Sequence, residues 1–168
     1  GSDEFTSQMH SYFAREEDER AVIDTPQDTL YEDALFIQLR ELDGAFDDGK
    51  EWSGALVPRL WVRRKKHESL RPVDATITRE EAEYDGNPVT RFTLSYEGQT
   101  ATFDVARKPP HRLLRWTRSD GTNMTLVGSE RLPYWKLNRP GDQSYLETLG
   151  IEPPQGPNQA DTPVDSND

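Results

Sequence analysis

The spacing of hydrophobic residues changes near residue 50, from a helical period to a strand period. Between Thr25 and Gly44, apolar residues recur every three or four positions, which is typical of the buried face of an α-helix. The members of this stripe are Tyr31, Ala34, Leu35, Leu39 and Leu42. Thr25 and Pro26 suit the N-cap and the first helical position, and Gly44 suits the position after the last turn. The pattern therefore predicts one long amphipathic helix over residues 25–44.

After residue 50, apolar and polar residues alternate, which predicts β-strands with one buried face. Three short sequences, YDGNP, YEGQ and SDGT, hold the Gly, Asp and Asn residues that tolerate the positive φ of hairpin turns. Strands in chain order that are joined by such turns form an antiparallel meander. We expect six strands, at Ala55–Arg64, Pro72–Glu80, Pro88–Tyr96, Thr100–Ala106, Arg112–Arg118 and Thr122–Leu137, the last of them broken near Pro133.

The alternation also predicts which side chains meet. Phe92 and Leu94 lie on one face of their strand, and Ala101 and Phe103 lie on one face of the next. Across the YEGQ turn we therefore expect Phe92 to face Phe103 and Leu94 to face Ala101.

A second, shorter helix is predicted near the end of the patterned region. Asp142 suits its N-cap, Gly150 suits its C-terminal stop, and Tyr145, Leu146 and Leu149 lie on one side. The fold class expected from these elements is α+β and mostly β. It is a curved antiparallel meander of about six strands packed on one long N-terminal helix, with a short C-terminal helix.

Length and composition indicate one domain. A chain of 168 residues, 33% of them hydrophobic, supplies one core. We expect a single β-rich domain at residues 25–150. Residues 1–24 open with GSDEF, which looks like an expression-vector remnant, and continue as an acidic segment. Residues 151–168 carry four prolines and four acidic residues, so we expect a disordered acidic tail there.

The net charge of −11 argues against nucleic-acid binding, because a surface that tracks phosphates needs an excess of Lys and Arg. Most of this charge lies at the ends. Residues 1–20 carry six acids and two bases, residues 151–168 carry four acids and no base, and residues 21–150 carry 21 acids against 18 bases. The chain has no run of about 18 apolar residues, so we expect no transmembrane segment.

Metal and thiol chemistry find little support. The chain has no cysteine, which excludes disulfides, thiolate metal sites and thiol nucleophiles within it. His10, His67 and His111 do not show the usual zinc-ligand spacings, and the acidic loop Asp43–Glu51 lacks the ligand positions of an EF-hand. We expect no metal and no cofactor.

His111 is the candidate for catalysis. It follows Pro109 and Pro110 at the start of a strand, and Asp104 or Asp120 could orient it. No G-x-S-x-G nucleophile motif accompanies it. The favoured interpretation is a histidine that hydrogen-bonds to the backbone, so no catalytic residue is assigned, and a hydrolase that uses His111 is the alternative.

Two groups of residues are candidates for binding. Six apolar side chains on the strands either fill a core or line a cavity for an apolar or lipid-like ligand: Phe92, Leu94, Phe103, Trp116, Met124 and Leu126. Four basic residues between Trp61 and Pro72 either bind an anionic group or are solvated in a hairpin connection: Arg63, Arg64, Lys65 and Lys66.

The order of these segments resembles a known family. The sequence DTLYEDALFIQLRELDG, a block of strands, and PPHRLLRWTRSDGTNMTLVGSE are similar to the second half of exported bacterial proteins catalogued as domain of unknown function 3108. The similarity runs from Asp28 to Glu130, and the longer N-terminal β half of the family is missing. It implies a periplasmic or exported location and a curved antiparallel sheet of the kind that carries lipids or lipoproteins. The family has no assigned activity, so no catalytic residue is carried over.

Three functions follow as hypotheses. The first is a non-enzymatic, envelope-located binding or carrier module for an apolar or lipid-like partner. The second is a structural or protein-interaction domain with a filled core, which contacts an envelope protein through Tyr134 and Trp135 or through the tails. The third is the hydrolase that uses His111.

Overall fold

The computed structural model of the chain describes residues 2–9, 19–42, 44–46, 48–61, 69–139 and 141–152. The chain divides into two units, residues 1–125 and residues 126–168. The described strands all lie in the first unit, whereas the described helical segments of the second unit are short 3-10 helices.

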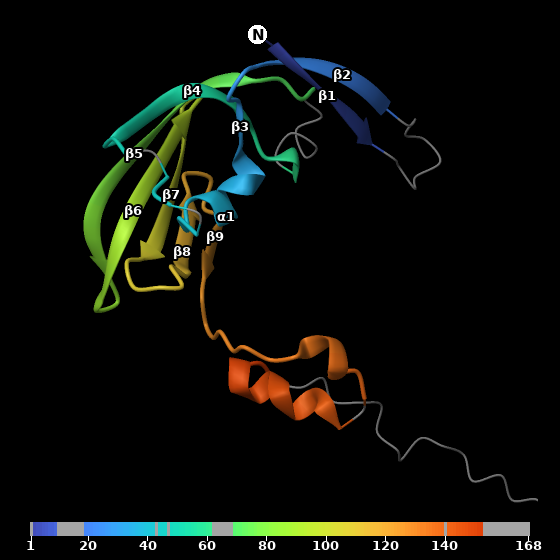
Figure 1. Cartoon of the computed structure of the whole chain (residues 1–168), viewed down its shortest axis with the longest axis vertical. Coiled ribbons are helices and arrows are strands. Elements are labelled where there is room, and N and C mark those ends of the chain that lie inside the picture. The colour runs from blue at the N-terminus through green and yellow to red at the C-terminus, as the bar shows by residue number, and fades with distance from the viewer. Residues whose placement is uncertain are drawn as a thin grey trace, which may run out of the picture. The chain divides into compact units, whose positions relative to one another are not determined.

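The first unit is built on a curled sheet of seven strands (Figure 1). The strands lie in chain order, so each pairs with its neighbours in the sequence. All adjacent strands are antiparallel except β3 and β4, which are parallel. The predicted antiparallel order is therefore confirmed from β4 to β9. The strands are β3 (Leu30–Tyr31), β4 (Glu51–Val57), β5 (Val73–Tyr84), β6 (Asn87–Tyr96), β7 (Gln99–Ala106), β8 (Leu113–Arg118) and β9 (Asn123–Thr125).

The strand boundaries match the prediction best in the middle of the sheet. The predicted strands at Pro88–Tyr96, Thr100–Ala106 and Arg112–Arg118 agree with β6, β7 and β8 within one residue. Three predicted strands are misplaced at one or both ends, and one of them, β5, continues to Tyr84, four residues beyond the predicted end at Glu80. Strand β4 stops before Pro58, which has no N–H to donate to a neighbouring strand. Strand β9 stops at Thr125, the last residue of the first unit.

The long helix predicted over residues 25–44 is wrong, and so is a fold class built on a meander packed against it. Thr25 and Pro26 instead end strand β2 (Glu19–Pro26), which pairs antiparallel with β1 (Ser2–Met9). Backbone pairing with β1 thus outweighs the helix-capping preferences of these two residues, as tertiary context often does. The acidic composition of the first 24 residues did not predict this hairpin.

A short helical segment is present within the predicted helix, and it buries two leucines. The 3-10 helix η1 (Glu32–Ala34) leads into α1 (Leu35–Gln38). Leu35 and Leu39, four residues apart, are 0% and 1% exposed and belong to the core. On either side, Asp28 and Glu41 have φ values of 65° and 54°, which an α-helix cannot include. The apolar stripe was therefore right about Leu35 and Leu39 and wrong about the length of the helix.

The predicted C-terminal helix is present as a 3-10 helix, η3 (Asp142–Leu149). Gly150 ends it with a φ of 70°, the left-handed conformation that favours glycine at this position. Gly141 rather than Asp142 is the N-cap. A second 3-10 helix, η2 (Tyr134–Lys136), lies within the segment that was predicted to end the last strand.

The core of the first unit lies against one face of the sheet. Phe92 pairs with Phe103 and Leu94 pairs with Ala101, as the alternation predicted. Phe103 pairs in turn with Trp116 of β8, so a row of aromatic side chains crosses three strands. The buried core residues are Leu35, Leu39, Leu56, Val73, Ala75, Ile77, Phe92, Leu94, Tyr96, Ala101, Phe103, Val105 and Trp116.

Two tight turns set the register of these strands. Asp85 and Gly86 have φ values of 48° and 71°, and Glu97 and Gly98 have values of 44° and 72°. Two consecutive positive φ values are the signature of the type I′ hairpin turn, whose twist matches that of the strands.

Candidate functional site

The apolar residues predicted to bind a ligand fall into two groups. Phe92, Leu94, Phe103 and Trp116 are at most 1% exposed and lie inside the core. A ligand would reach these four side chains only after the core had opened. Met124 and Leu126 are exposed instead, at 48% and 40%. The structure therefore does not bring the six residues together on one accessible surface.

Two aromatic residues close the core over the sheet. The ring of Phe36 contacts those of Phe103 and Trp116, with centroid distances of 5.5 and 5.3 Å. The ring of Phe46 meets Phe92 edge-on at 6.1 Å. The chain's own side chains thus occupy the space where an apolar ligand was expected. The predicted anion-binding residues, Arg63, Arg64, Lys65 and Lys66, lie outside the described residues.

His111 lies in the turn between β7 and β8 and is held by backbone contacts. Its Nδ1 lies 3.2 Å from the carbonyl oxygen of Ala106, so Nδ1 carries a proton and donates it. The Arg40 side chain donates to the carbonyl oxygens of Pro110 and His111, at 3.2 and 3.1 Å. The interpretation of His111 as a residue that bonds to the backbone is confirmed.

The carboxylates considered as partners of His111 are engaged elsewhere. Asp104 accepts hydrogen bonds from the Nε atoms of Arg91 and Arg115, at 2.7 and 2.8 Å. Asp120 accepts from Arg118 at 3.3 Å and from the backbone of Thr122 at 2.9 Å. Its hydrogen bonds to Thr122 and the charge of Arg118 lower the pKa of Asp120. Neither carboxylate orients the imidazole, so the hydrolase hypothesis gains no support from this geometry.

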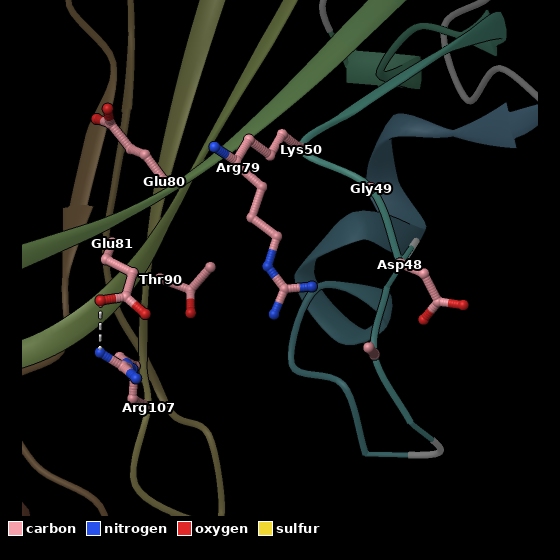
Figure 2. A pocket seen from close by; sticks show the side chains of 9 residues that line it. Asp48, Gly49, Lys50, Arg79, Glu80, Glu81, Thr90 and Arg107 are labelled. Carbon is pink, nitrogen blue, oxygen red and sulfur yellow. Dashed lines mark ion pairs between the residues drawn. The ribbon is translucent and has the colours of Figure 1, made fainter.

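A groove of about 760 Å³ lies between the segment before β4 and strands β5 and β6 (Figure 2). Arg79 projects from β5 toward the middle of this groove, whereas its neighbour Glu80 projects to the other side of the strand. A smaller pocket of about 120 Å³ shares Arg79, Thr90 and Arg107 with the groove and also reaches His111 and Glu41. The groove is lined by Ala45, Asp48, Gly49, Lys50, Arg79, Glu80, Glu81, Thr90 and Arg107.

Three of the six charged residues that line the groove take part in ion pairs that the structure describes. A nitrogen of the Arg79 guanidinium lies 2.8 Å from Glu41 Oε1, and one of Arg107 lies 3.1 Å from Glu81 Oε2. The Arg79 guanidinium also lies over the ring of Phe92, 5.6 Å from its centroid. An apolar ligand would strip water from these charges without replacing it, which costs free energy. The groove is therefore suited to a polar surface and not to a lipid chain.

The most buried polar cluster joins η1 to the ends of two strands. Glu32 is 0% exposed, and it forms an ion pair with Arg118, whose side chain is 1% exposed. Glu32 Oε2 accepts hydrogen bonds from the Tyr96 hydroxyl at 2.7 Å and from the backbone N–H of Arg59 at 2.9 Å. Arg118 also donates to the Tyr96 oxygen at 3.3 Å. The side chains of Glu32, Tyr96 and Arg118 each have hydrogen-bond partners within the cluster, so the cluster holds η1 against the sheet.

The ionisation of the cluster is set by burial and by its own hydrogen bonds. Burial, followed by the hydrogen bond to Glu32, raises the pKa of Tyr96 to about 12. Burial alone lowers the pKa of Arg118, but the Tyr96 hydrogen bond and the charge of Glu32 outweigh this effect and raise it. At neutral pH the tyrosine is therefore neutral and the arginine charged. This cluster could not be predicted from the sequence, because its members are far apart in the chain and each residue type is common on surfaces.

A second polar cluster lies on the face of the sheet opposite the core. Asp104 is 0% exposed and sits between Arg91 and Arg115. The Arg115 guanidinium in turn lies over the ring of Tyr84, 4.4 Å from its centroid. The hydrogen bond to Asp104 raises the pKa of Arg91. Together these side chains shield a carboxylate that would otherwise face solvent.

The second unit carries an exposed aromatic pair. Tyr134 and Trp135 are 76% and 63% exposed, and their rings meet edge-on with centroids 5.4 Å apart. The turn that holds them is closed by hydrogen bonds from the Lys136 N–H to Pro133 at 2.8 Å and from Asn138 to Trp135 at 2.9 Å. The aromatic pair is thus presented to solvent on a short ordered helix.

Comparison with known protein families, with curated proteins and with solved structures found no match. The resemblance to domain of unknown function 3108 therefore stays a prediction. Within the described residues, no helix has the length and apolar character needed to cross a lipid bilayer.

Proposed function

We propose that this chain is a non-enzymatic protein-interaction domain with a filled core, which contacts its partner through Tyr134 and Trp135. The observation that carries the proposal is the contrast between the buried aromatic residues of the core and the exposed aromatic pair of the second unit. Trp116 and Phe103 are at most 1% exposed, whereas Tyr134 and Trp135 are 76% and 63% exposed. Large aromatic side chains in water are costly unless something covers them, and they are enriched at protein interfaces.

The filled core supports this function over that of an apolar carrier. A carrier needs a cavity that its ligand can enter, and typical ligand pockets are lined mostly by apolar side chains. Here Phe36 and Phe46 pack onto the aromatic row of the sheet, and the described groove is lined by charges. Binding a lipid would require both residues to leave their places.

The residues around the aromatic pair suggest the chemistry of the partner. Arg131, Lys136 and Arg139 lie within five residues of Tyr134 or Trp135 in the sequence, and no acidic residue lies between Arg131 and Arg139. Tyr, Trp and Arg are the residues that most often dominate binding energy at interfaces. A protein surface with an apolar pocket bordered by carboxylates is therefore the expected partner, in the bacterial envelope if the family resemblance holds.

Site-specific photo-cross-linking tests the contact surface. A photoreactive amino acid at position 135, in the full chain produced in its native cells, should give one dominant cross-linked protein. The matched control carries the same amino acid at Trp61, which is equally exposed at 61% but lies in the first unit. Equal products at both positions, or none at position 135, would contradict the proposal.

A thermal melt distinguishes the proposed function from an apolar carrier. A ligand at 100 times its Kd stabilises the protein that binds it by about 2.7 kcal/mol. We expect saturating fatty acid or lysophospholipid, below its micellar concentration, to leave the melting temperature unchanged. A rise of several degrees would favour the carrier and refute the filled core.

A further inference from the structure

The edge strand β9 is short, at three residues, but it lacks two other features that usually protect the edge of a sheet, charge and proline. It is the last strand of the seven, and it carries neither charge nor proline. The uncharged stretch runs from Gly121 to Gly128, with the sequence GTNMTLVG. Natural edge strands are commonly blunted by Lys, by proline or by a covering segment, because their free N–H and C=O groups can pair with another chain.

The phase of the β8–β9 pairing shows which backbone groups are free. The Arg118 N–H donates to the Thr122 carbonyl oxygen at 2.8 Å, and Trp116 pairs with Met124. Backbone groups alternate along a strand, so those of Thr122 and Met124 face β8 and those of Asn123 and Thr125 face outward. In the part of the chain that the structure describes, no hydrogen bond reaches these outward groups of Asn123 and Thr125.

The strand-forming sequence is longer than the strand. Alternation in the sequence predicts an extended segment from Thr122 past Val127, yet β9 stops at Thr125. Met124, Leu126 and Val127 are 48%, 40% and 81% exposed. Three large apolar side chains in six residues, at and just beyond a strand without charge or proline, indicate a segment that could extend its strand beside another strand.

We infer that the missing strand is β9 of a second copy of this chain, added antiparallel so that two sheets join edge to edge. Antiparallel pairing about Thr125 sets this residue opposite its own copy and sets Asn123 opposite Val127. Both pairs then use the outward backbone groups. Met124 comes opposite Leu126 of the other copy, on one face and in the closely spaced, non-hydrogen-bonded position.

The register keeps charges away from the two-fold axis, since the first charged residues that it sets opposite each other are Asp120 and Glu130, five positions from Thr125. No charged residue lies between Asp120 and Glu130, so the paired segments bring no like charges together near the two-fold axis. The four exposed side chains of two Met124 and two Leu126 residues cover one another. Such an interface, in which one patch meets its own copy, has the closed symmetry of most homodimers. This dimer is independent of the contact proposed for Tyr134 and Trp135.

Sedimentation velocity over a range of concentrations tests the dimer, with Thr125→Pro as the disrupting variant. Because the Thr125 N–H faces away from β8, proline removes a bond of the dimer and none of the monomer. We expect the full chain to show a species of twice its mass at high concentration, and Thr125→Pro to stay monomeric. Should the proline disturb folding, Met124→Lys places a charge in the same contact without altering the backbone.

Cross-linking tests the register, since the chain has no natural cysteine. Thr125→Cys should be joined to its copy by a short bis-maleimide, because cross-strand Cβ atoms lie about 4.5–5.5 Å apart. Thr117→Cys, on the neighbouring strand β8 that is paired on both sides, should not.

The variants distinguish self-association through the β9 edge from self-association through Tyr134 and Trp135. A chain that stays monomeric at every concentration, or a dimer that Thr125→Pro and Met124→Lys both leave intact, would overturn the inference. The double variant Tyr134→Ser/Trp135→Ser should keep the dimer. Loss of the dimer in this variant, together with its survival in Thr125→Pro, would place self-association on the aromatic pair instead.

Discussion

Replacing Arg118 by methionine should destabilise the protein far more than removing an exposed ion pair. Methionine keeps most of the apolar stem of Arg118 but leaves Glu32 without its counter-ion. Glu32 is 0% exposed, and its remaining partners, the Tyr96 hydroxyl and the Arg59 N–H, both bind Oε2. Oε1 is therefore left buried with no partner that the structure describes.

The magnitude follows from the burial of the pair. Removing one partner of a buried ion pair costs about 3–5 kcal/mol, because an uncompensated charge stays in the interior. The ion pair between Arg71 and Glu97 provides the matched control. Its side chains are 61% and 36% exposed, and such pairs contribute only about 0–1 kcal/mol. Arg71→Met should therefore cost no more than this amount.

Urea denaturation measures both variants, and a double variant identifies the cause. Glu32→Gln/Arg118→Met removes the stranded charge and should recover most of the loss, with a coupling energy of about 1–3 kcal/mol. Equal losses for Arg118→Met and Arg71→Met, or additive effects in the double variant, would refute the argument that burial sets the cost.

Three further changes have expected results in the same urea assay. The pKa of Tyr96 is raised to about 12 from the ordinary 10, so the contribution of Tyr96 to the free energy of unfolding is full below pH 10 and falls by about 2–3 kcal/mol as the pH rises to 12. Tyr96→Phe should abolish this pH dependence of the free energy of unfolding, and a dependence that persists would assign it to another group. Gly86→Ala should cost about 1–2 kcal/mol because its φ is 71°, although an added Cβ meets nothing. Gly141→Ala, at a φ of −87° and equally open, should cost nothing, and equal losses would contradict the role of φ. Asp104→Asn weakens two charge-assisted hydrogen bonds of a fully buried carboxylate and should cost about 2–4 kcal/mol, so a loss below about 0.5 kcal/mol would show that its arginine partners are dispensable.

The central strands were predictable because local and long-range preferences agree there. The turns YDGNP and YEGQ demand positive φ at two successive residues, and the structure has it at Asp85 and Gly86 and at Glu97 and Gly98. A two-residue turn fixes the register, and the apolar alternation then decides which face is buried. Phe92 and Phe103 meet for this reason.

The long helix failed because its signals did not exclude another structure. Thr25 suits an N-cap, but a β-branched residue also suits a strand, and pairing with β1 is a long-range interaction that a local pattern does not contain. The stripe of apolar residues was satisfied by burying Leu35 and Leu39 in a single turn. A spacing of four residues therefore shows that two side chains share a face, and says less about how far the helix extends.

The same limit applies to the candidate site. Alternation placed Phe92, Leu94, Phe103 and Trp116 on a common face, and this is where the structure has them. Whether that face is empty or filled depends on which distant segments return to it, and Phe36 and Phe46 arrive from outside the strands that the alternation described. The cluster of Glu32, Tyr96 and Arg118 depends on the same return of η1 to the sheet.

The core is covered over β6, β7 and β8, whereas the last strand of the sheet, β9, is left partly exposed. A curled sheet offers its inner face to whatever segment can reach it. Phe36 of α1 covers Phe103 and Trp116 of β7 and β8, and Phe46, in the loop before β4, covers Phe92 of β6. Arg59 supports this cover, since its guanidinium lies 4.7 Å from the Trp116 ring centroid and its Nε lies 3.1 Å from Asp33. Beyond β8, strand β9 is three residues long and Met124 is 48% exposed. A lipid ligand would have to displace the existing cover, whereas a protein strand would add to an edge that is already vacant in the described chain, so contact with protein is the function that this fold makes easier.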